Sequence, residues 1–283
     1  MKMKKVLFVM LFSSVFLLAA CSPQAQATEV VSEDAKEPES SEEMVEEEGE
    51  QMLDEGGDEI MDEEDDMADS EMTEDEMMDQ QITFVIRIEN ASPEGGLTVL
   101  APGAYELNDR PIAFFTPGEA DRGLGLEALA EDGDPSVLVG TIGEMMGDET
   151  MSSFAVEAFN TPLGADAPGP AGPGAAYEFT VAAYPGQYLT IATMFVQSND
   201  WFFAPGADGI ELFGADGSPI SGDLTDQFFL WNAGTELDQT PGEGADQAPR
   251  QAGPNTGEDE DGIVSLVEDF TNYQILVTIT PQS

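Results

Sequence analysis

The sequence has no histidine, a single cysteine and only 8 basic residues against 58 acidic ones, which gives a formal charge of −50. Without histidine and a second cysteine, the usual zinc sites and the Ser-His-Asp and Cys-His catalytic arrangements are excluded. The scarcity of Lys and Arg excludes the clustered phosphate contacts of nucleic-acid-binding proteins. Carboxylate and carbonyl oxygens remain, and these are the ligands of hard cations such as Ca²⁺.

Long hydrophobic runs are also missing, except for one near the N-terminus. Residues 6–18 are almost entirely apolar and follow three lysines within the first five residues, which is typical of a signal peptide. The run ends in Leu-Ala-Ala-Cys21, which resembles the bacterial lipobox, and this resemblance implies that the thiol of Cys21 carries a lipid. An ordinary secretory signal with a stray cysteine is the alternative. We expect residues 1–21 to be a lipoprotein signal peptide ending in Cys21.

No other stretch approaches the roughly 18 apolar residues that a membrane helix needs. The chain is therefore predicted to be attached to the bacterial cell envelope through a lipid on Cys21, without spanning the membrane. The membrane is thus its first predicted partner.

Residues 22–81 are strongly acidic and contain no aromatic residue. Nearly half of the 58 acidic residues lie between Glu29 and Asp79, where Lys36 is the single base. Such a segment cannot bury enough apolar surface to offset the entropy lost on ordering. We expect a disordered acidic tether. Its densest runs, such as residues 62–66, have a second interpretation as a low-affinity Ca²⁺ buffer or a docking strip for a basic partner.

Residues 82–283 have the composition of a folded domain, and several windows alternate between apolar and polar residues. The alternation in residues 82–88 and 177–181 predicts half-buried strands, and residues 187–196 and 273–279 are suited to central strands. Two windows, residues 119–131 and 135–146, resemble helices. Residues 162–176, rich in Pro and Gly, are predicted to form a loop. Many short strands with one or two short helices favour an all-β fold, an antiparallel β-sandwich.

Two carboxylates occur where predicted strands end, each in a short segment that contains a tryptophan, and one of them lies near a Gly turn. Asp200 precedes Trp201, and Glu236 lies five residues after Trp231. In each segment we expect the tryptophan to anchor the loop in the core while the carboxylate faces outward. Oxygens four residues apart across a Gly turn can converge on one Ca²⁺ ion. Taken alone, this spacing favours ordinary surface residues.

The order of three motifs resembles the spondin N-terminal domain family: residues 115–134, then 193–203 with Asp-Trp-Phe, then 230–236 with Asn-Ala-Gly-Thr-Glu. The resemblance covers essentially all of residues 82–283. It implies a C2-like antiparallel β-sandwich that binds Ca²⁺ through loops at one end. The family's metal ligands fall on Asp200, Asn232 and Glu236. The family commonly has Asp at position 232, so Asn232 removes one negative charge from the site.

Two further acidic regions are less informative. Glu131, Asp132 and Asp134 are expected at the end of a helix and its turn, where a structural role is favoured over metal binding because Asp accepts backbone N–H groups in tight turns. Residues 240–261 read as a long acidic insertion that forms an exposed flap.

The function predicted from these features is a non-catalytic module on the cell surface. It is lipid-anchored and Ca²⁺-binding, and its partner is an extracellular protein or a polysaccharide; nucleic acid is excluded. The alternative is a glycoside hydrolase or carbohydrate-processing accessory protein, because that chemistry needs only paired carboxylates. A passive structural lipoprotein is a third reading. An enzyme should have a deep pocket containing a carboxylate of raised pKa, whereas a binding module should have a shallow loop face around Asp200 and Glu236.

Overall fold

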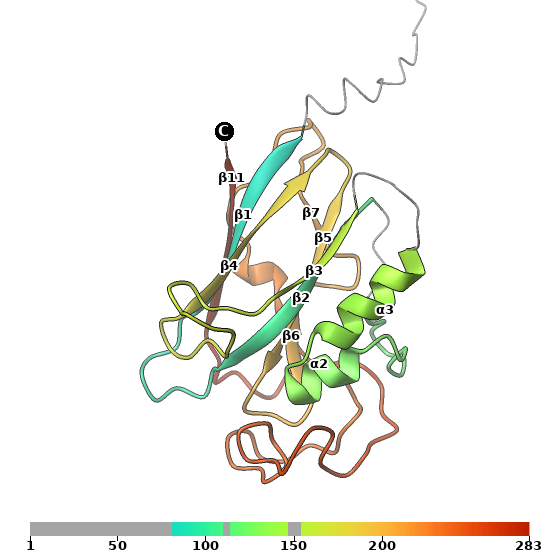
Figure 1. Ribbon diagram of the computed structural model, residues 1–283, viewed down its shortest axis with the longest axis vertical. Helices are drawn as coiled ribbons and strands as arrows, with labels where there is room; N and C mark the ends of the chain where they lie inside the picture. Colours follow the sequence, from blue (N-terminus) through green and yellow to red (C-terminus); the bar gives the residue numbers. More distant parts are fainter. Residues whose placement is uncertain (1–80, 110–113, 147–153, 283) are drawn as a thin grey trace, which may run out of the picture. The chain divides into compact units, whose positions relative to one another are not determined.

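The computed structural model describes residues 81–109, 114–146 and 154–282 of the chain. The predicted signal peptide 1–21, Cys21 and nearly all of the acidic tether 22–81 lie outside the described residues. Within those residues the fold is an antiparallel β-sandwich with two short helices, as the sequence predicted (Figure 1).

One face of the sandwich is a four-stranded sheet in the order β4-β1-β11-β8. Strand β1 lies between β4 and β11 and pairs with both in antiparallel register, so that Ile86 is opposite both Phe179 and Ile279. The bounds of these strands are β1 (Ile82–Asn90), β4 (Ala176–Ala183), β8 (Gly222–Asp223) and β11 (Ile275–Gln282).

The other face is a seven-stranded sheet in the order β10-β9-β6-β5-β2-β3, with the short β7 also paired to β5. Strand β5 is nearly fully buried along its length. A short 3₁₀ turn, η1 (Thr225–Gln227), precedes β9. The strands are β2 (Leu100–Asn108), β3 (Ala155–Phe159), β5 (Tyr188–Phe195), β6 (Trp201–Ala204), β7 (Ile210–Glu211), β9 (Phe229–Asn232) and β10 (Ser265–Leu266).

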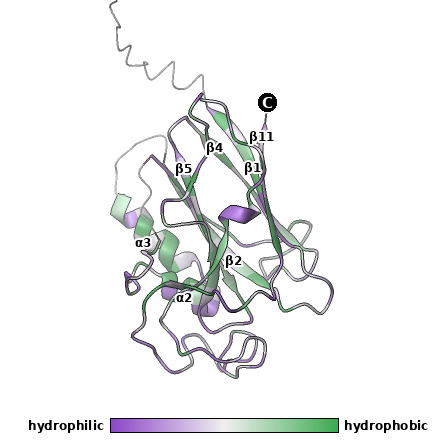
Figure 2. Ribbon diagram, turned by 180° about the vertical axis from the view of Figure 1, so that it is seen from behind, coloured by the Kyte–Doolittle hydropathy of each residue, from purple (hydrophilic) through white to green (hydrophobic). Residues whose placement is uncertain are grey.

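The main core lies between the two sheets. Phe84, Ile86 and Ile88 of β1 are fully buried, while the residues between them remain partly exposed. This is the period-2 pattern of a strand with one face toward a core, and it confirms the strand that the alternation predicted. Figure 2 shows the same arrangement, with hydrophobic colour concentrated on the strands. From the opposite sheet, Leu189 and Ile191 of β5 join the same cluster.

The two helices cover the outer face of the seven-stranded sheet and form a second core. Leu129 of α2 (Leu126–Asp132) and Leu138 and Ile142 of α3 (Ser136–Met146) pack with Phe202 and Trp231. This cover explains why β5 is buried on both faces. Among the described residues, no helix has the length and apolarity needed to cross a membrane.

The predicted helix 119–131 is wrong in its first half, because α2 begins only at Leu126. Gly125 precedes it with a φ of 107°, and a Cβ there would lie 2.5 Å from the backbone nitrogen of Leu138. The close approach of α3 therefore requires glycine at this position, and its left-handed φ prevents the helix from starting earlier. The predicted helix 135–146 is confirmed within one residue. The strand expected at 273–279 starts and ends a few residues later, as β11.

Two glycine-to-alanine changes should shift stability in opposite directions. In β2, a Cβ on Gly103 would lie 2.3 Å from the backbone oxygen of Ala192, so Gly103→Ala should destabilise the fold by about 1–3 kcal/mol. In α3, Gly140 has nothing within 4 Å of such an atom, so Gly140→Ala should stabilise by roughly 0.5–1 kcal/mol. Thermal unfolding measures both, at about 2–4 °C per kcal/mol for a domain of this size. A Gly103→Ala variant as stable as the wild type would contradict the observed contact.

Candidate functional site

The candidate site lies at one end of the seven-stranded sheet, where β6 begins and β9 ends. These strands pair antiparallel with Trp201 opposite Asn232. Asp200, just before β6, therefore meets residues 233–236, just after β9, and the N–H of Ala233 donates to the backbone oxygen of Asp200 at 3.1 Å. The structure thus brings the predicted residues Asp200, Asn232 and Glu236 to the same end of the sheet, although they are far apart in sequence.

The carboxylate of Asp200 is completely buried, with 0 % of its surface exposed. Its Oδ2 accepts hydrogen bonds from the backbone N–H groups of Thr235 at 2.9 Å and Glu236 at 3.3 Å. Its Oδ1 is buried and has no hydrogen-bond partner. The expectation that Asp200 faces outward is therefore wrong, because the amides of the turn after β9 draw the carboxylate inward.

Glu236 is also buried, with 3 % exposed, so the expectation of a surface position is wrong here too. Its Oε1 accepts a hydrogen bond from Nδ2 of Asn199 at 2.9 Å. The oxygen of the same Asn199 amide accepts the backbone N–H of Gln239 at 3.0 Å, which fixes the orientation of the amide. Glu236 is thus held in place by a side-chain amide that is itself held by the backbone.

The acidic insertion 240–261, predicted to be an exposed flap, is largely exposed, but part of it also covers Glu236. Glu236 forms an isolated β-bridge with Asp259, and the N–H of Leu237 donates to the backbone oxygen of Glu258 at 2.8 Å. Any Cβ at position 257 would overlap the carboxylate of Glu236, so Gly257 gives that carboxylate its space. Backbone pairing turns the insertion into a lid over the site.

Helix α2 supplies a third carboxylate that the sequence analysis did not assign to the site. Glu131 is 4 % exposed. Burial raises its pKa to about 7; the hydroxyl of Thr235 opposes this rise, and the negative charges of Glu127, Glu236 and Asp200 add to it. Glu131 therefore interacts with both Asp200 and Glu236. Its position depends on how α2 packs on the sheet, and no local sequence signal distinguishes it from its acidic neighbours.

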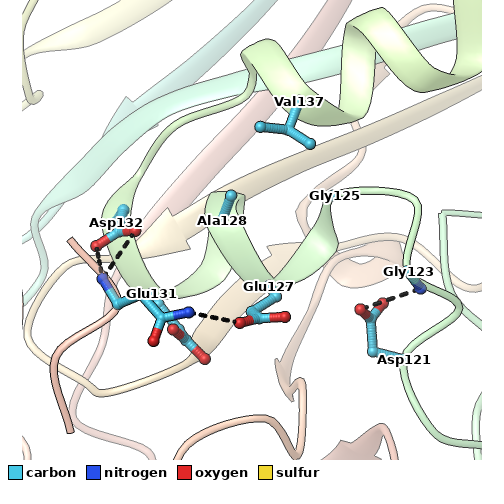
Figure 3. A pocket seen from close by; sticks show the side chains of 9 residues that line it. Asp121, Gly123, Gly125, Glu127, Ala128, Glu131, Asp132 and Val137 are labelled. Carbon is cyan, nitrogen blue, oxygen red and sulfur yellow. Dashed lines mark hydrogen bonds between the residues drawn. The ribbon is translucent and has the colours of Figure 1, made fainter.

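Asp132 and Asp134, the other two acidic residues at the end of α2, have the structural role that was predicted. Only Asp134 binds the backbone of its own turn. Asp134 accepts the backbone N–H of Ser136 at 2.9 Å, next to the start of α3. Asp132 instead binds the insertion. It accepts the side-chain N–H of Gln251 at 2.8 Å and the backbone N–H of Asn255 at 3.2 Å, and Figure 3 draws the second of these bonds. The lid is therefore fastened to α2.

Asn232 has two partners, and neither is one of the three buried carboxylates. Its Oδ1 accepts the backbone N–H of Gly234 at 2.6 Å, and its Nδ2 donates to Asp238 at 3.0 Å. Gly234 has a φ of 71°, and a Cβ there would lie 2.6 Å from the backbone nitrogen of Ile263. The turn that carries Asn232 thus depends on glycine for its shape.

The three carboxylates are electrostatically unbalanced. Burial raises the pKa of Asp200 to about 7, against hydrogen bonds from the amides of residues 234–236, and burial also raises the pKa of Glu236. In the described part of the chain, the partners found for Asp200, Glu236 and Glu131 are amides and a hydroxyl, with no Lys or Arg among them. Within that part, no three His, Cys, Asp or Glu side chains lie close enough to hold a metal ion by themselves. Backbone carbonyls or water would have to complete a cation site.

Two adjoining pockets lie beside this cluster and share Asp121, Gly123, Glu127 and Asn255. The first, of about 320 Å³, is drawn in Figure 3 and is lined by Glu127, Glu131 and Asp132 from α2. The second, of about 390 Å³, extends toward Thr235 and residues 259–262 of the lid. Asn255 donates to Glu127 at 2.9 Å and so lies between the lid and the helix. Glu131 is therefore reachable from solvent through an acidic entrance.

No known family model matches the chain, and no curated protein shows significant similarity to it. The resemblance to the spondin N-terminal domain family therefore stays a prediction.

The raised pKa of Asp200 makes stability depend on pH when divalent cations are chelated. The native pKa of about 7 lies above the ordinary value of 3.8, so the native state binds more protons than the unfolded state between these values. The stabilisation is complete below about pH 4 and is lost as the pH rises toward 7. In chelator, we expect the melting temperature of the wild type to be several degrees higher at pH 5 than at pH 8.

The Asp200→Asn variant distinguishes the effect of Asp200 on the pH dependence of stability from the effect of the chain's overall negative charge. Self-repulsion among the many carboxylates acts in both proteins, so the pH dependence that is lost in the variant belongs to Asp200. Identical melting curves against pH for the two proteins would contradict the assigned pKa.

Proposed function

We propose that this protein is a Ca²⁺-binding surface module whose metal site is built around Asp200. The observation that carries the proposal is the Oδ1 atom of Asp200, which is buried and has no partner. An ionised carboxylate in that position is costly unless a cation balances it. A hard divalent cation supplies both the missing partner and the missing charge.

The proposed ligands are Asp200, Asn232 and Glu236, and Glu131 is a further negative charge near the site. The charges of Asp200 and Glu236 add to the rise in the pKa of Glu131, so a cation bound by those two residues would also relieve the repulsion on Glu131. Asn232 would contribute its Oδ1, which already accepts the N–H of Gly234. Ca²⁺ takes 6–8 oxygens at about 2.3–2.6 Å, so carbonyls and water would provide the remainder.

The proposed setting is the bacterial cell envelope, where a lipid on Cys21 attaches the protein to the membrane. The lipobox-like sequence before Cys21 supports this setting. In it, the module binds an extracellular protein or a polysaccharide without catalysis. The acidic composition fits an environment with screening salt or abundant Ca²⁺.

The glycoside hydrolase remains the second candidate, because one observation favours it. Glu131 lines a pocket of about 320 Å³ and has a pKa near 7, which suits a general acid. A hydrolase also needs a second carboxylate facing the same substrate. Glu127 and Asp132 line the same pocket, but Glu127 accepts a hydrogen bond from Asn255, and Asp132 accepts from Gln251 and Asn255. Release of reducing sugar by the purified protein, lost in Glu131→Gln, is the result that would favour the hydrolase.

Calcium should stabilise the wild type strongly. At about 100 times the dissociation constant, a ligand adds roughly 2.7 kcal/mol, or about 5–10 °C at this size. We expect this rise in melting temperature with Ca²⁺ relative to chelator, and a much smaller one with Mg²⁺, which demands a stricter octahedral geometry. Asp200→Asn should remove most of the rise.

Asp216→Asn is the matched control for that substitution. Asp216 is exposed and satisfied by the backbone N–H and hydroxyl of Ser218, so its removal should leave the calcium response intact. An unchanged response in Asp200→Asn would remove Asp200 from the ligand set. The absence of any response in the wild type would reject the calcium site as a whole.

The lipid anchor is tested independently by Cys21→Ser. Expressed in a bacterium that processes lipoproteins, the wild type should enter the detergent-rich phase of a Triton X-114 extraction, because acyl chains on Cys21 supply the membrane affinity. The variant lacks the acceptor thiol and should stay in the aqueous phase or keep its signal peptide, which mass spectrometry distinguishes. Equal partitioning of both proteins would rule out lipidation at Cys21.

A further inference from the structure

A third pocket, which shares no lining residue with the two beside α2, carries a separate inference. It has a volume of about 330 Å³ and lies where the start of β6 and the end of β9 meet the segment 265–270. Its lining includes Trp201, Asn232 and Asp238 from the strand ends and the loop after β9, and Glu268, Asp269 and Phe270 from the segment after β10. We propose that this pocket binds an uncharged pyranose ring of a polysaccharide. The inference rests on the proposed function, whose extracellular ligand it names.

Trp201 has a hydrogen-bond donor that the protein leaves unused. The residue is only 7 % exposed, and its Nε1 is buried without a hydrogen-bond partner. The other tryptophan, Trp231, donates from its Nε1 to the backbone oxygen of Ala204 at 3.2 Å. A buried N–H group without an acceptor is costly and uncommon. Asp238 lies close enough to interact with the indole of Trp201, but their geometry falls short of a hydrogen bond. A ligand oxygen would satisfy this donor.

Two aromatic rings form an apolar corner in the same pocket. The rings of Trp201 and Phe270 have their centroids 5.4 Å apart and cross at 61°. The indole is held from behind by Phe195, whose ring is nearly parallel to it at 6.2 Å. Such a corner offers apolar surface to the C–H groups of a sugar ring at little cost in side-chain order, because rigid aromatic side chains lose few rotamers on binding.

The rest of the pocket supplies acceptors. The carboxylates of Asp238, Glu268 and Asp269 line it together with the hydroxyl of Ser265, and no basic residue takes part. Carboxylates accept hydrogen bonds strongly from O–H groups. A ring with several hydroxyls both donates to these acceptors and offers an oxygen to the Trp201 N–H. This combination matches an uncharged sugar.

Two other ligand classes fit less well. A uronic acid or a sulfated sugar would place a negative charge among three carboxylates, which repel it. An organic cation, such as an alkylated ammonium group, would suit the carboxylates and the aromatic faces, but it has no acceptor for the N–H of Trp201. The N–H of Trp201, which lacks an acceptor, therefore favours a sugar over an organic cation.

The test is a ligand-observed NMR titration of the purified protein in calcium buffer. The probes are glucose, galactose, mannose and N-acetylglucosamine, with glucuronate as the anionic match of glucose and tetramethylammonium as the cation. We expect at least one uncharged sugar to bind with a dissociation constant on the order of 1–10 mM, the range of weak single-ring ligands. Glucuronate and tetramethylammonium should bind at least tenfold more weakly.

Two variants locate the binding in this pocket. Trp201→Phe keeps an aromatic ring beside Phe195 but removes the N–H, and should weaken sugar binding about tenfold. Phe270→Leu keeps an apolar side chain but removes the second ring, and should weaken binding several-fold. Trp231→Phe is the control, because it removes an indole N–H outside the pocket and should bind the sugar as the wild type does. A cooperative thermal unfolding transition in each variant verifies that it is folded.

The experiment distinguishes failure of the sugar pocket from failure of the metal site. No response to any uncharged sugar at about 100 mM, with the calcium response intact, would overturn the sugar pocket while leaving the metal module standing. The same holds if tetramethylammonium binds instead, or if folded Trp201→Phe binds sugar as tightly as the wild type. Sugar binding that follows the variants in a protein without a calcium response would support the pocket and reject the metal site.

Discussion

The candidate site depends on the antiparallel pairing of β6 with β9. With Trp201 opposite Asn232, the residue before one strand and the turn after the other are forced together, and the amides of that turn bind the carboxylate of Asp200. The same pairing places Phe202 and Trp231 on the outer face of the sheet, where α2 packs. Glu131 reaches the site through this packing. The four residue pairs between β6 and β9 thus position the buried carboxylates and part of the lining of the aromatic pocket.

The carboxylate of Asp200 is only half satisfied. Asp200 has one oxygen bound by backbone amides and one without a partner, and Glu236 has one oxygen bound by Asn199. Amide donors lower the cost of burying these groups, but they do not cancel a net charge. A fold selected for stability alone would replace such groups with apolar ones. Buried carboxylates that lack partners, at the end of an otherwise well-packed sandwich, are typical of functional sites, where groups that lower stability are kept.

Much of the fold could be predicted because its signals are local. Alternation in β1 and the long apolar run of β5 depend only on which side of a strand faces the core, and both strands appear where expected. The start of α2 could not be predicted, because it depends on how closely α3 approaches Gly125. Motif order pointed to Asp200, Asn232 and Glu236, which the structure brings to one end of the sheet, but it did not indicate the burial of Asp200 and Glu236. Glu131, the lid and the unused donor of Trp201 arise from contacts between segments distant in sequence, which no spacing rule encodes.

The two ends of the sandwich hold different parts of the chain. Ile82, the first residue of β1, is paired with Ala183, the last residue of β4. From there the chain turns and β5 runs the length of the sheet to Phe195, close before Asp200. The start of β1 and the carboxylate cluster therefore lie at opposite ends of the sandwich, and Figure 1 shows α2 and β6 at the end away from the start of β1. Within the described domain, the residue where β1 begins is therefore separated from the cluster, its lid and the aromatic pocket by the full length of the strands.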